Sequence, residues 1–207
     1  MNIKYINIES ELMPYYLSYR SYIVLVMSNK EFYKKKLNDK IIKKVFYTPR
    51  TRNELYNTID IWIKDKEECK NKYGDISRWN TKYITDMSYI FYCAVNFNED
   101  INEWIVYNVK KMNYMFYCAI NFNKPLNKWN VKNVNNMSSM FSTAKSFNQP
   151  LDEWNIVNVK TMNFMFSAAS SYNKNLNKWK IKRKKVSCSG MFYNAYRMAK
   201  LNLPIYT

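Results

Sequence analysis

The chain has 207 residues, of which 33 are Lys or Arg, 16 are Asp or Glu and none is His. This length suits one domain, or one domain with a small appendage, and a hydrophobic content of 47% can supply a core. The absence of histidine excludes Ser-His-Asp and Cys-His nucleophile pairs and His-ligated zinc. The only two glycines are far apart, so they cannot form a glycine-rich phosphate loop. We therefore expect a protein that is not an enzyme and that uses no cofactor and no metal.

The sequence shows no pattern of membrane insertion or secretion. Its longest apolar run, residues 22–27, is far shorter than the ~20 residues that a membrane span requires. A basic start followed by an apolar core and a cleavage site is also missing. We therefore expect an intracellular protein whose four cysteines are reduced. No CxxC pair indicates zinc binding or thioredoxin-like chemistry.

Residues 1–45 are predicted to form a helical preface. Leu12, Met13 and Pro14, followed by residues 22–33, resemble a degenerate F-box, in which a proline-led helix precedes an apolar helix. An additional helical hairpin, packed on the following segment, is the alternative interpretation of the same residues.

Residues 46–78 are predicted to form a helical N-terminal cap. Thr51 and Glu54 fit a capping box, and an apolar stripe of Leu55, Ile59 and Trp62 follows at helical spacing. A second short helix is expected over residues 66–73, closed by Gly74. Together the two helices would cover the apolar end of the segment that follows.

An internal repeat of 25 residues organises the chain from residue 79 to residue 207. Tryptophan, methionine and phenylalanine recur in step, and we expect them to form the core. These predicted core residues are Trp79, Trp104, Trp129, Trp154, Trp179, Met112, Met137, Met162, Phe116, Phe141 and Phe166. Since one 25-residue unit cannot bury these side chains alone, neighbouring units should bury them together.

Within one repeat, the spacing predicts a strand and a helix. In the third repeat, the apolar residues of segment 134–144 lie on one face of a three-turn helix, and Trp129 and Val131 alternate with polar residues as in a short strand. The sequence therefore predicts an α/β fold: a leucine-rich-repeat-like solenoid of about five 25-residue coils with a helical N-terminal cap. One asparagine recurs in each turn and should hydrogen-bond to the neighbouring repeat. These are Asn98, Asn123, Asn148 and Asn173.

The last repeat departs from this register from about residue 180. Met191 and Phe192 begin 12 rather than 11 residues after Trp179, so one residue is inserted within segment 180–190. Terminal repeats are commonly atypical, because they form the end of an array. We therefore expect residues 180–207 to act as a C-terminal cap.

The repeat pattern from Trp129 to Glu153 resembles the BspA-like surface-protein repeat, a divergent relative of leucine-rich repeats. The resemblance covers about residues 45–200 and includes segment 48–79, which is similar to the lead-in helices of the family. Members encoded by large DNA viruses are the most similar, because they are short, rich in Lys and Asn and without a signal peptide. The resemblance implies a binding or scaffold role, and it implies no reaction. If the protein is viral, we expect it in the host cytoplasm or in the virion.

Charge indicates a second group of candidate residues. The segment after residue 75 carries 18 basic and only 6 acidic side chains, and no acidic residue follows Glu153. The resulting positive electrostatic field favours binding of nucleic acid or another polyanion. An AT-biased genome would also enrich the sequence in Lys and Asn. The run 180–185 fits a nuclear-import signal, a polyanion clamp or a solvated face of the terminal repeat. The candidate partner-binding residues are Lys128, Lys132, Lys178, Lys180, Lys182, Arg183, Lys184 and Lys185.

Two other sets of residues are candidate sites. Cys93 and Cys118 occupy the same repeat position, which would place them within disulfide range, but Thr143 and Ala168 at the equivalent positions favour a small residue packed in the core. The acidic pairs 99–100 and 152–153 lie in turns, where solubilising charges are expected rather than a catalytic pair.

The function that we expect is non-catalytic protein–protein recognition through the strand or turn face of the solenoid, with nucleic-acid or polyanion binding by the basic C-terminal half as the alternative. The residues before the five tryptophans vary while the core does not, as is typical of repeat proteins with extended binding faces. These variable residues are Arg78, Glu103, Lys128, Glu153 and Lys178.

Overall fold

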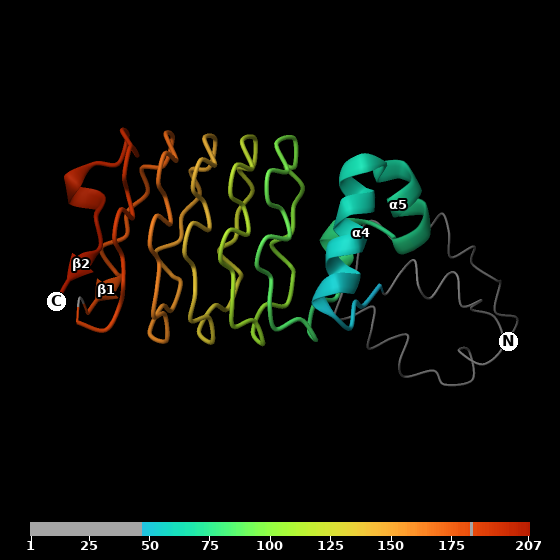
Figure 1. Cartoon of the computed structure of the whole chain (residues 1–207), viewed down its shortest axis with the longest axis horizontal. Coiled ribbons are helices and arrows are strands. Elements are labelled where there is room, and N and C mark those ends of the chain that lie inside the picture. Colours follow the sequence, from blue (N-terminus) through green and yellow to red (C-terminus); the bar gives the residue numbers. More distant parts are fainter. Residues whose placement is uncertain (1–46, 183) are drawn as a thin grey trace, which may run out of the picture. The chain divides into compact units, whose positions relative to one another are not determined.

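The computed structural model describes residues 47–182 and 184–207, which belong to one compact unit, Lys43–Thr207 (Figure 1). The predicted helical preface and its F-box-like segment lie outside the described residues. In chain order the elements are the helices α4 (Arg52–Lys64) and α5 (Lys66–Tyr73), the 3₁₀ turn η1 (Ile76–Arg78), the strand β1 (Lys180–Ile181), the 3₁₀ turn η2 (Lys200–Asn202) and the strand β2 (Ile205–Tyr206).

Helix α4 begins where the capping pattern predicts. The Thr51 side chain accepts a hydrogen bond of 3.1 Å from the Glu54 amide, while the Glu54 carboxylate accepts one of 2.8 Å from the Arg50 amide rather than from that of Thr51. The predicted apolar stripe is buried, with Thr58 added to it. Because both the N-cap and the apolar stripe match the prediction, local sequence alone was sufficient to predict this helix.

Helix α5 follows with only Asp65 between the two helices. The Asp65 amide donates to Ile61 O at 2.7 Å and closes α4, while its carboxylate accepts from the Glu68 amide at 2.9 Å and opens α5. Gly74 ends α5 with a φ of 75°, a conformation that glycine adopts without strain. The predicted second helix and its glycine stop are confirmed.

The predicted fold class, an α/β leucine-rich-repeat-like solenoid of about five coils, is wrong. Residues 79–179, all of which the structure describes, form turns and isolated bridges and contain no helix and no extended strand. Within the described residues the sheet is limited to β1 and β2, which pair in parallel with Lys180 opposite Ile205. The strand expected directly after each tryptophan occurs only after Trp179.

Left-handed backbone positions prevent a helix in each repeat. In the third repeat, Ser139 and Thr143 have φ values of 55° and 61°, and equivalent residues in the other repeats share this conformation. The amides of Met137, Ser139, Phe141 and Thr143 donate to carbonyls of the next repeat, 24 residues later. In a helix these amides would donate to carbonyls of the same helix. The apolar residues of this segment are therefore buried by successive turns instead of by one face of a helix.

Hydrogen bonds join successive repeats in register. The isolated parallel bridges pair equivalent residues of neighbouring repeats: Asp86 with Lys111, Lys111 with Asn136, Asn136 with Thr161, and Thr161 with Ser187. In Figure 1 the repeats accordingly lie side by side from residue 79 onward. The last bridge spans 26 residues rather than 25, which confirms the inserted residue of the last repeat.

Aromatic rings form columns through the core. Each of the five repeat tryptophans is at most 3% exposed, and the repeat methionines and phenylalanines named above are fully buried. Phe91, Phe116, Phe141, Phe166 and Phe192 stack from repeat to repeat at centroid distances of 5.3 to 5.6 Å. Near α4, the Trp62 ring meets Trp79 edge-on at 5.8 Å, so the helix contributes to the same core.

Asparagines form ladders between the repeats, as the sequence predicted. The Oδ1 atoms of Asn98, Asn123, Asn148 and Asn173 each accept a hydrogen bond from an amide of the following repeat, at 2.9 to 3.0 Å. A second ladder was missed: the Nδ2 atoms of Asn108, Asn133 and Asn158 donate to carbonyls of the preceding repeat at 2.7 to 2.8 Å. Its signal was present as an asparagine four residues after three of the tryptophans.

Candidate recognition surface

Four tyrosines of the first two repeats form a cluster on the surface. The rings stack across the repeats, with Tyr89 and Tyr114 at 4.8 Å and Tyr92 and Tyr117 at 5.0 Å between centroids. Within each repeat the two rings lie 5.7 Å apart, so each ring contacts two others. Tyr89 is 40% exposed and Tyr92 47%, while Tyr114 and Tyr117 are half-buried. We call these four residues the tyrosine cluster.

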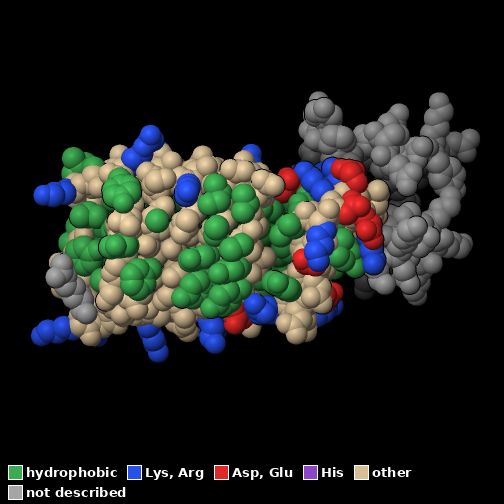
Figure 2. Space-filling view, turned by 45° about the horizontal axis from the view of Figure 1, so that its top comes forward, with side chains coloured by type: hydrophobic (Ala, Val, Ile, Leu, Met, Phe, Trp, Pro, Cys, Tyr) green, Lys and Arg blue, Asp and Glu red, His purple; other side chains and the backbone are tan. Residues whose placement is uncertain are grey.

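Two of these rings lie at a left-handed backbone position that recurs in the repeats. Tyr89 and Tyr114 have φ values of 64° and 57°, so both lie at the first left-handed position of their repeat. At the equivalent position the third repeat has Ser139, which is buried, and the fourth has Phe164, which is 47% exposed. Figure 2 shows hydrophobic side chains gathered on one face of the repeats beside the helical segment. The first two repeats therefore carry a tyrosine at a position where the third repeat carries a serine.

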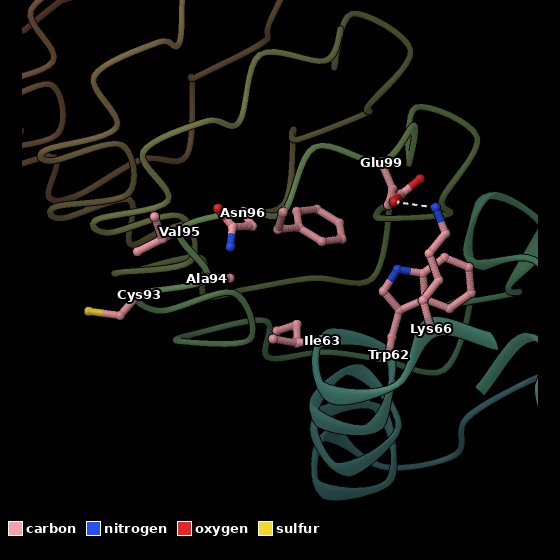
Figure 3. Close-up of a pocket in the computed structure, with 9 residues that line it drawn as sticks. Trp62, Ile63, Lys66, Cys93, Ala94, Val95, Asn96 and Glu99 are labelled. Atoms are coloured by element: carbon pink, nitrogen blue, oxygen red, sulfur yellow. Dashed lines mark hydrogen bonds and ion pairs between the residues drawn. The ribbon is translucent and has the colours of Figure 1, made fainter. Parts of the chain in front are cut away.

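A cavity of about 380 Å³ lies between α4 and the first repeat (Figure 3). Trp62 and Phe97 form its buried apolar part, while Ile63 and Val95 are 48% and 44% exposed. The cavity is lined by Trp62, Ile63, Lys66, Cys93, Ala94, Val95, Asn96, Phe97 and Glu99. Cys93, which lines the cavity, directly follows Tyr92 of the tyrosine cluster, so the cavity and the cluster adjoin along the chain.

An ion pair borders this cavity. Lys66 Nζ donates to Glu99 Oε1 at 2.7 Å and lies 5.5 Å from the centroid of the Trp62 ring. Figure 3 shows Lys66 and Glu99 together near Trp62, with Cys93 away from them. The hydrogen bond from Lys66 to Glu99 raises the pKa of the Lys66 ammonium, so the lysine stays charged. The cavity thus combines an apolar floor with one positive and one negative group.

The cysteine pair lies on the surface, so the interpretation as core packing is wrong. Cys93 is exposed and Cys118 half-buried, and both are free thiols with φ values of 54° and 56°. Their backbones are in register, because the Cys93 amide donates to Tyr117 O at 2.8 Å. Partial desolvation of the sulfur, and then the neighbouring Cys118, raise the pKa of the Cys93 thiol, which lowers its reactivity at neutral pH. The small side chains at this position are therefore not explained by core packing.

The predicted basic residues divide into two groups. Lys128 is ion-paired with Glu103, and Lys178 with both Glu153 and Asp152. The residues before successive tryptophans alternate in charge, and oppositely charged neighbours form ion pairs between repeats. They are therefore not simply variable surface positions. The remaining described lysines of the set are exposed, and none of them forms an ion pair with another described residue: Lys132, Lys180, Lys182, Lys184 and Lys185. Arg183 lies outside the described residues.

The acidic pairs of the turns do not form an enclosed site. Glu99 is paired with Lys66, and Asp152 with Lys178 at 3.2 Å. Asp100 accepts a hydrogen bond of 2.9 Å from the Asn102 amide, as expected of a turn residue. Among the described residues, no three Cys, Asp or Glu side chains gather into a possible metal site, and no helix could cross a membrane.

One family model matches most of the described chain. It is the model of the family described as Mycoplasma protein of unknown function, DUF285, and it matches residues 64–179 and, in a second alignment, residues 106–203. Together the two alignments cover more than half of the 207 residues. The chain belongs to this family. Membership agrees with the resemblance to BspA-like repeats at the level of the repeat family.

The DUF285 alignments begin within α4 and end just before β2, so they contain every repeat tryptophan. The tyrosine cluster and most of the cavity lining therefore lie within the family segment. No curated protein and no solved structure matches the chain.

Proposed function

We propose that the protein is a non-catalytic recognition module that binds a protein partner through the tyrosine cluster and the adjoining cavity. The observation that carries this proposal is the contact of four surface tyrosines in two stacked pairs. Tyrosine offers a large apolar ring and a polar hydroxyl, and it is enriched among the residues that dominate binding energy at protein interfaces.

Stacking favours binding, because it restricts the rings before a partner arrives. Each tyrosine of the cluster contacts two others, so less side-chain entropy is lost on binding than for isolated surface rings. The backbone that holds them is fixed by bonds between repeats, such as Tyr89 N to Asn113 O at 3.2 Å. A surface that is both aromatic and pre-organised is suited to a partner with an apolar patch.

The cavity adds a place for one apolar side chain of that partner. Its floor contains Trp62 and Phe97, and its exposed margin contains Ile63 and Val95. Lys66 and Glu99 at the rim can exchange their mutual ion pair for contacts with polar groups of the partner. An apolar centre bordered by polar groups is the usual arrangement of a protein interface.

The resemblance to virus-encoded BspA-like repeats suggests where such a module acts. The short, Lys- and Asn-rich sequence supports a relationship to the virus-encoded members of BspA-like repeats, so we propose a viral structural or host-interaction role in the host cytoplasm or the virion. The F-box-like resemblance of residues 1–45 remains a prediction. Deletion of residues 1–45 should abolish partner capture only if that segment, rather than the tyrosine cluster, carries binding.

The proposal can be tested with serine substitutions that the repeats themselves contain. Ser139 and Ser142 occupy the positions equivalent to Tyr114 and Tyr117, so serine is compatible with the backbone there. The quadruple variant Y89S/Y92S/Y114S/Y117S should lose partners in a nuclease-treated pull-down from host-cell lysate, quantified by mass spectrometry. We expect at least a ten-fold lower recovery of the proteins that the unchanged chain captures.

The control removes exposed tyrosines at another place. Tyr193 and Tyr196 are 63% and 82% exposed and lie in the last repeat, outside the cluster. The variant Y193S/Y196S should capture the same proteins as the unchanged chain. Equal losses in both variants, or recovery that persists without the four tyrosines, would contradict the proposed surface.

A further inference from the structure

Charge is unevenly distributed between two turns of each repeat. One turn region comprises residues 80–86, 105–111, 130–136, 155–161 and 180–187, and we call it the lysine edge. Its only described acidic residue is Asp86, and its nine lysines are all exposed. They are Lys82, Lys110, Lys111, Lys132, Lys160, Lys180, Lys182, Lys184 and Lys185.

The other turn region, residues 98–103, 123–128, 148–153 and 173–178, holds the five remaining acidic residues of the repeats. Four of these five form ion pairs with lysines: Glu99, Glu103, Asp152 and Glu153. Positive charge in this region is therefore largely neutralised, whereas on the lysine edge it is not. The net charge of the repeats is concentrated on one edge, which composition alone could not show.

Hydrogen bonds between repeats make the lysine edge continuous. Asn108 Nδ2 donates to Lys82 O, and Asn133 Nδ2 donates to Tyr107 O. The backbone amide of Lys110 donates to Thr85 O at 2.7 Å, and that of Lys160 to Asn135 O at 2.8 Å. Each repeat on this edge therefore lies beside the next, at the spacing of about 4.8 Å that backbone hydrogen bonds impose.

The lysines alternate between two positions along this edge. Three residues after the tryptophan lie Lys82, Tyr107, Lys132, Val157 and Lys182, and six residues after it lie Lys110 in the second repeat and Lys160 in the fourth. Each of the five repeats thus presents at least one lysine, in a zigzag row. None of these lysines is ion-paired with a described residue. A row of this kind is complementary to a linear polymer of negative charge.

One exposed aromatic ring interrupts the row. Tyr107 lies between Lys82 and Lys132 at the same repeat position, and its side chain is 52% exposed. At the start of the edge, Tyr83 is flanked by Arg50, 4.2 Å from its ring centroid, and by Lys82 at 4.9 Å. Lysines interleaved with an open aromatic ring are the features that bind single-stranded nucleic acid, because bases stack on rings while phosphates meet cations.

We propose that the lysine edge binds single-stranded nucleic acid, with phosphates on the zigzag of lysines and a base on Tyr107. A duplex keeps its bases stacked inside and cannot offer one to Tyr107, so the exposed ring favours a single strand. The site differs from the one that composition suggested: it runs along all the repeats rather than the C-terminal half, and it excludes the ion-paired Lys128 and Lys178. It shares no residue with the tyrosine cluster.

The test measures fluorescence anisotropy of a fluorescein-labelled oligothymidylate of about 20 nucleotides, titrated with the full chain at several salt concentrations. In K82Q/K110Q/K132Q/K160Q the dissociation constant should rise at least ten-fold. The slope of log K against log salt should become shallower by about 3, because each lost phosphate contact on a single strand removes about 0.7. Replacing the same four lysines with arginine should retain binding, which shows that charge rather than folding is responsible.

The matched control removes four positive charges elsewhere. Lys124, Lys145, Lys174 and Lys200 lie in the repeats but outside the lysine edge, and K124Q/K145Q/K174Q/K200Q should change the slope by less than about 1. Y107A should weaken binding of the oligonucleotide about ten-fold, Y107F should not, and Y107A should leave the weaker binding of a duplex of equal length unchanged. The quadruple serine variant of the tyrosine cluster should bind the oligonucleotide like the unchanged chain.

Several outcomes would overturn the proposal. These are absence of binding by the unchanged chain at low salt, equal losses in the two glutamine variants, and displacement of the oligonucleotide by polyglutamate as readily as by unlabelled oligonucleotide. The last result would assign the edge to acidic protein segments. Binding that depends on the lysines but not on Tyr107 would overturn the preference for a single strand.

Discussion

The indole Nε1 of Trp129 donates a hydrogen bond of 3.0 Å to the carbonyl oxygen of Ile101, 28 residues earlier. The same bond recurs from Trp104 to Ile76, from Trp154 to Leu126 and from Trp179 to Leu151, at 2.8 to 3.0 Å. Each of these four tryptophans therefore fills the core and also donates to a carbonyl of a buried residue, which accepts a backbone amide as well, as Ile101 O does from Trp104 N at 3.1 Å. The two roles can be separated by mutation.

Replacement of Trp129 by alanine should lower the free energy of unfolding by about 3–5 kcal/mol, because a large buried ring is lost from the middle of the repeats. W129F keeps an aromatic ring but removes the indole donor, while Ile101 O still accepts from the Trp104 amide at 3.1 Å, so a smaller loss of about 0.5–1.5 kcal/mol is expected. W179A should cost less than W129A, since only the last repeat lies beyond it. Urea unfolding followed by circular dichroism would measure the three values, and equal losses for W129A and W179A would contradict the expected order.

Replacement of Tyr172 by phenylalanine should stabilise the protein. Tyr172 continues the column of Phe97, Phe122 and Phe147, stacked on Phe147 at 5.8 Å, but its buried hydroxyl has no hydrogen-bond partner among the described residues. An unsatisfied buried hydroxyl costs about 1–3 kcal/mol, so Y172F should raise the melting temperature. The reverse change, F147Y, should lower it. A lower melting temperature for Y172F would show that the hydroxyl does have a partner.

Replacement of Gly190 by alanine should be destabilising for two reasons that a double mutant can separate. Gly190 has a φ of 61°, which costs about 1–2 kcal/mol for a residue with a Cβ. A Cβ there would also lie 2.3 Å from the ring of Phe164. In the F164S background only the backbone cost should remain, so G190A should be less harmful there than in the unchanged chain. Equal losses in both backgrounds, measured by calorimetry, would show that the Phe164 ring moves aside freely.

The contribution of Asp75 should depend on pH. Burial acts to raise the pKa of Asp75, but hydrogen bonds from the Ser77 hydroxyl and amide, at 2.6 and 3.1 Å, and the nearby Lys70 outweigh it and lower the pKa. A carboxyl with a lowered folded-state pKa stabilises the protein above its unfolded pKa of about 3.9, and this stabilisation is lost as pH falls through the lower value.

D75N should therefore be less stable than the unchanged chain at pH 7, and the difference should disappear as the pH falls through the lowered folded-state pKa of Asp75. Denaturant unfolding over a series of pH values would measure this, with S77A as an intermediate case because it removes one of the hydrogen bonds. A difference between D75N and the unchanged chain that does not vary with pH would contradict the assignment.

The local sequence was sufficient for the helices and for the identity of the buried residues. Thr51, Asp65 and Gly74 mark helix ends through their own side chains and backbone preferences, so α4 and α5 could be predicted without tertiary information. The 25-residue period likewise identified the residues that lie in the core, because burial of an apolar side chain depends on its repetition in register. The asparagine ladder followed from the same reasoning.

Only the tertiary structure decided the backbone conformation of the repeats and the position of the surfaces. The apolar spacing of segment 134–144 is equally compatible with a helix and with successive turns, and hydrogen bonds to the next repeat at Ser139 and Thr143 select the turns. The tyrosine cluster and the lysine edge each combine residues about 25 positions apart, whose proximity depends on which turn of each repeat they occupy. Local periodicity determines which side chains are buried, whereas pairing between distant backbone groups determines where the exposed ones meet.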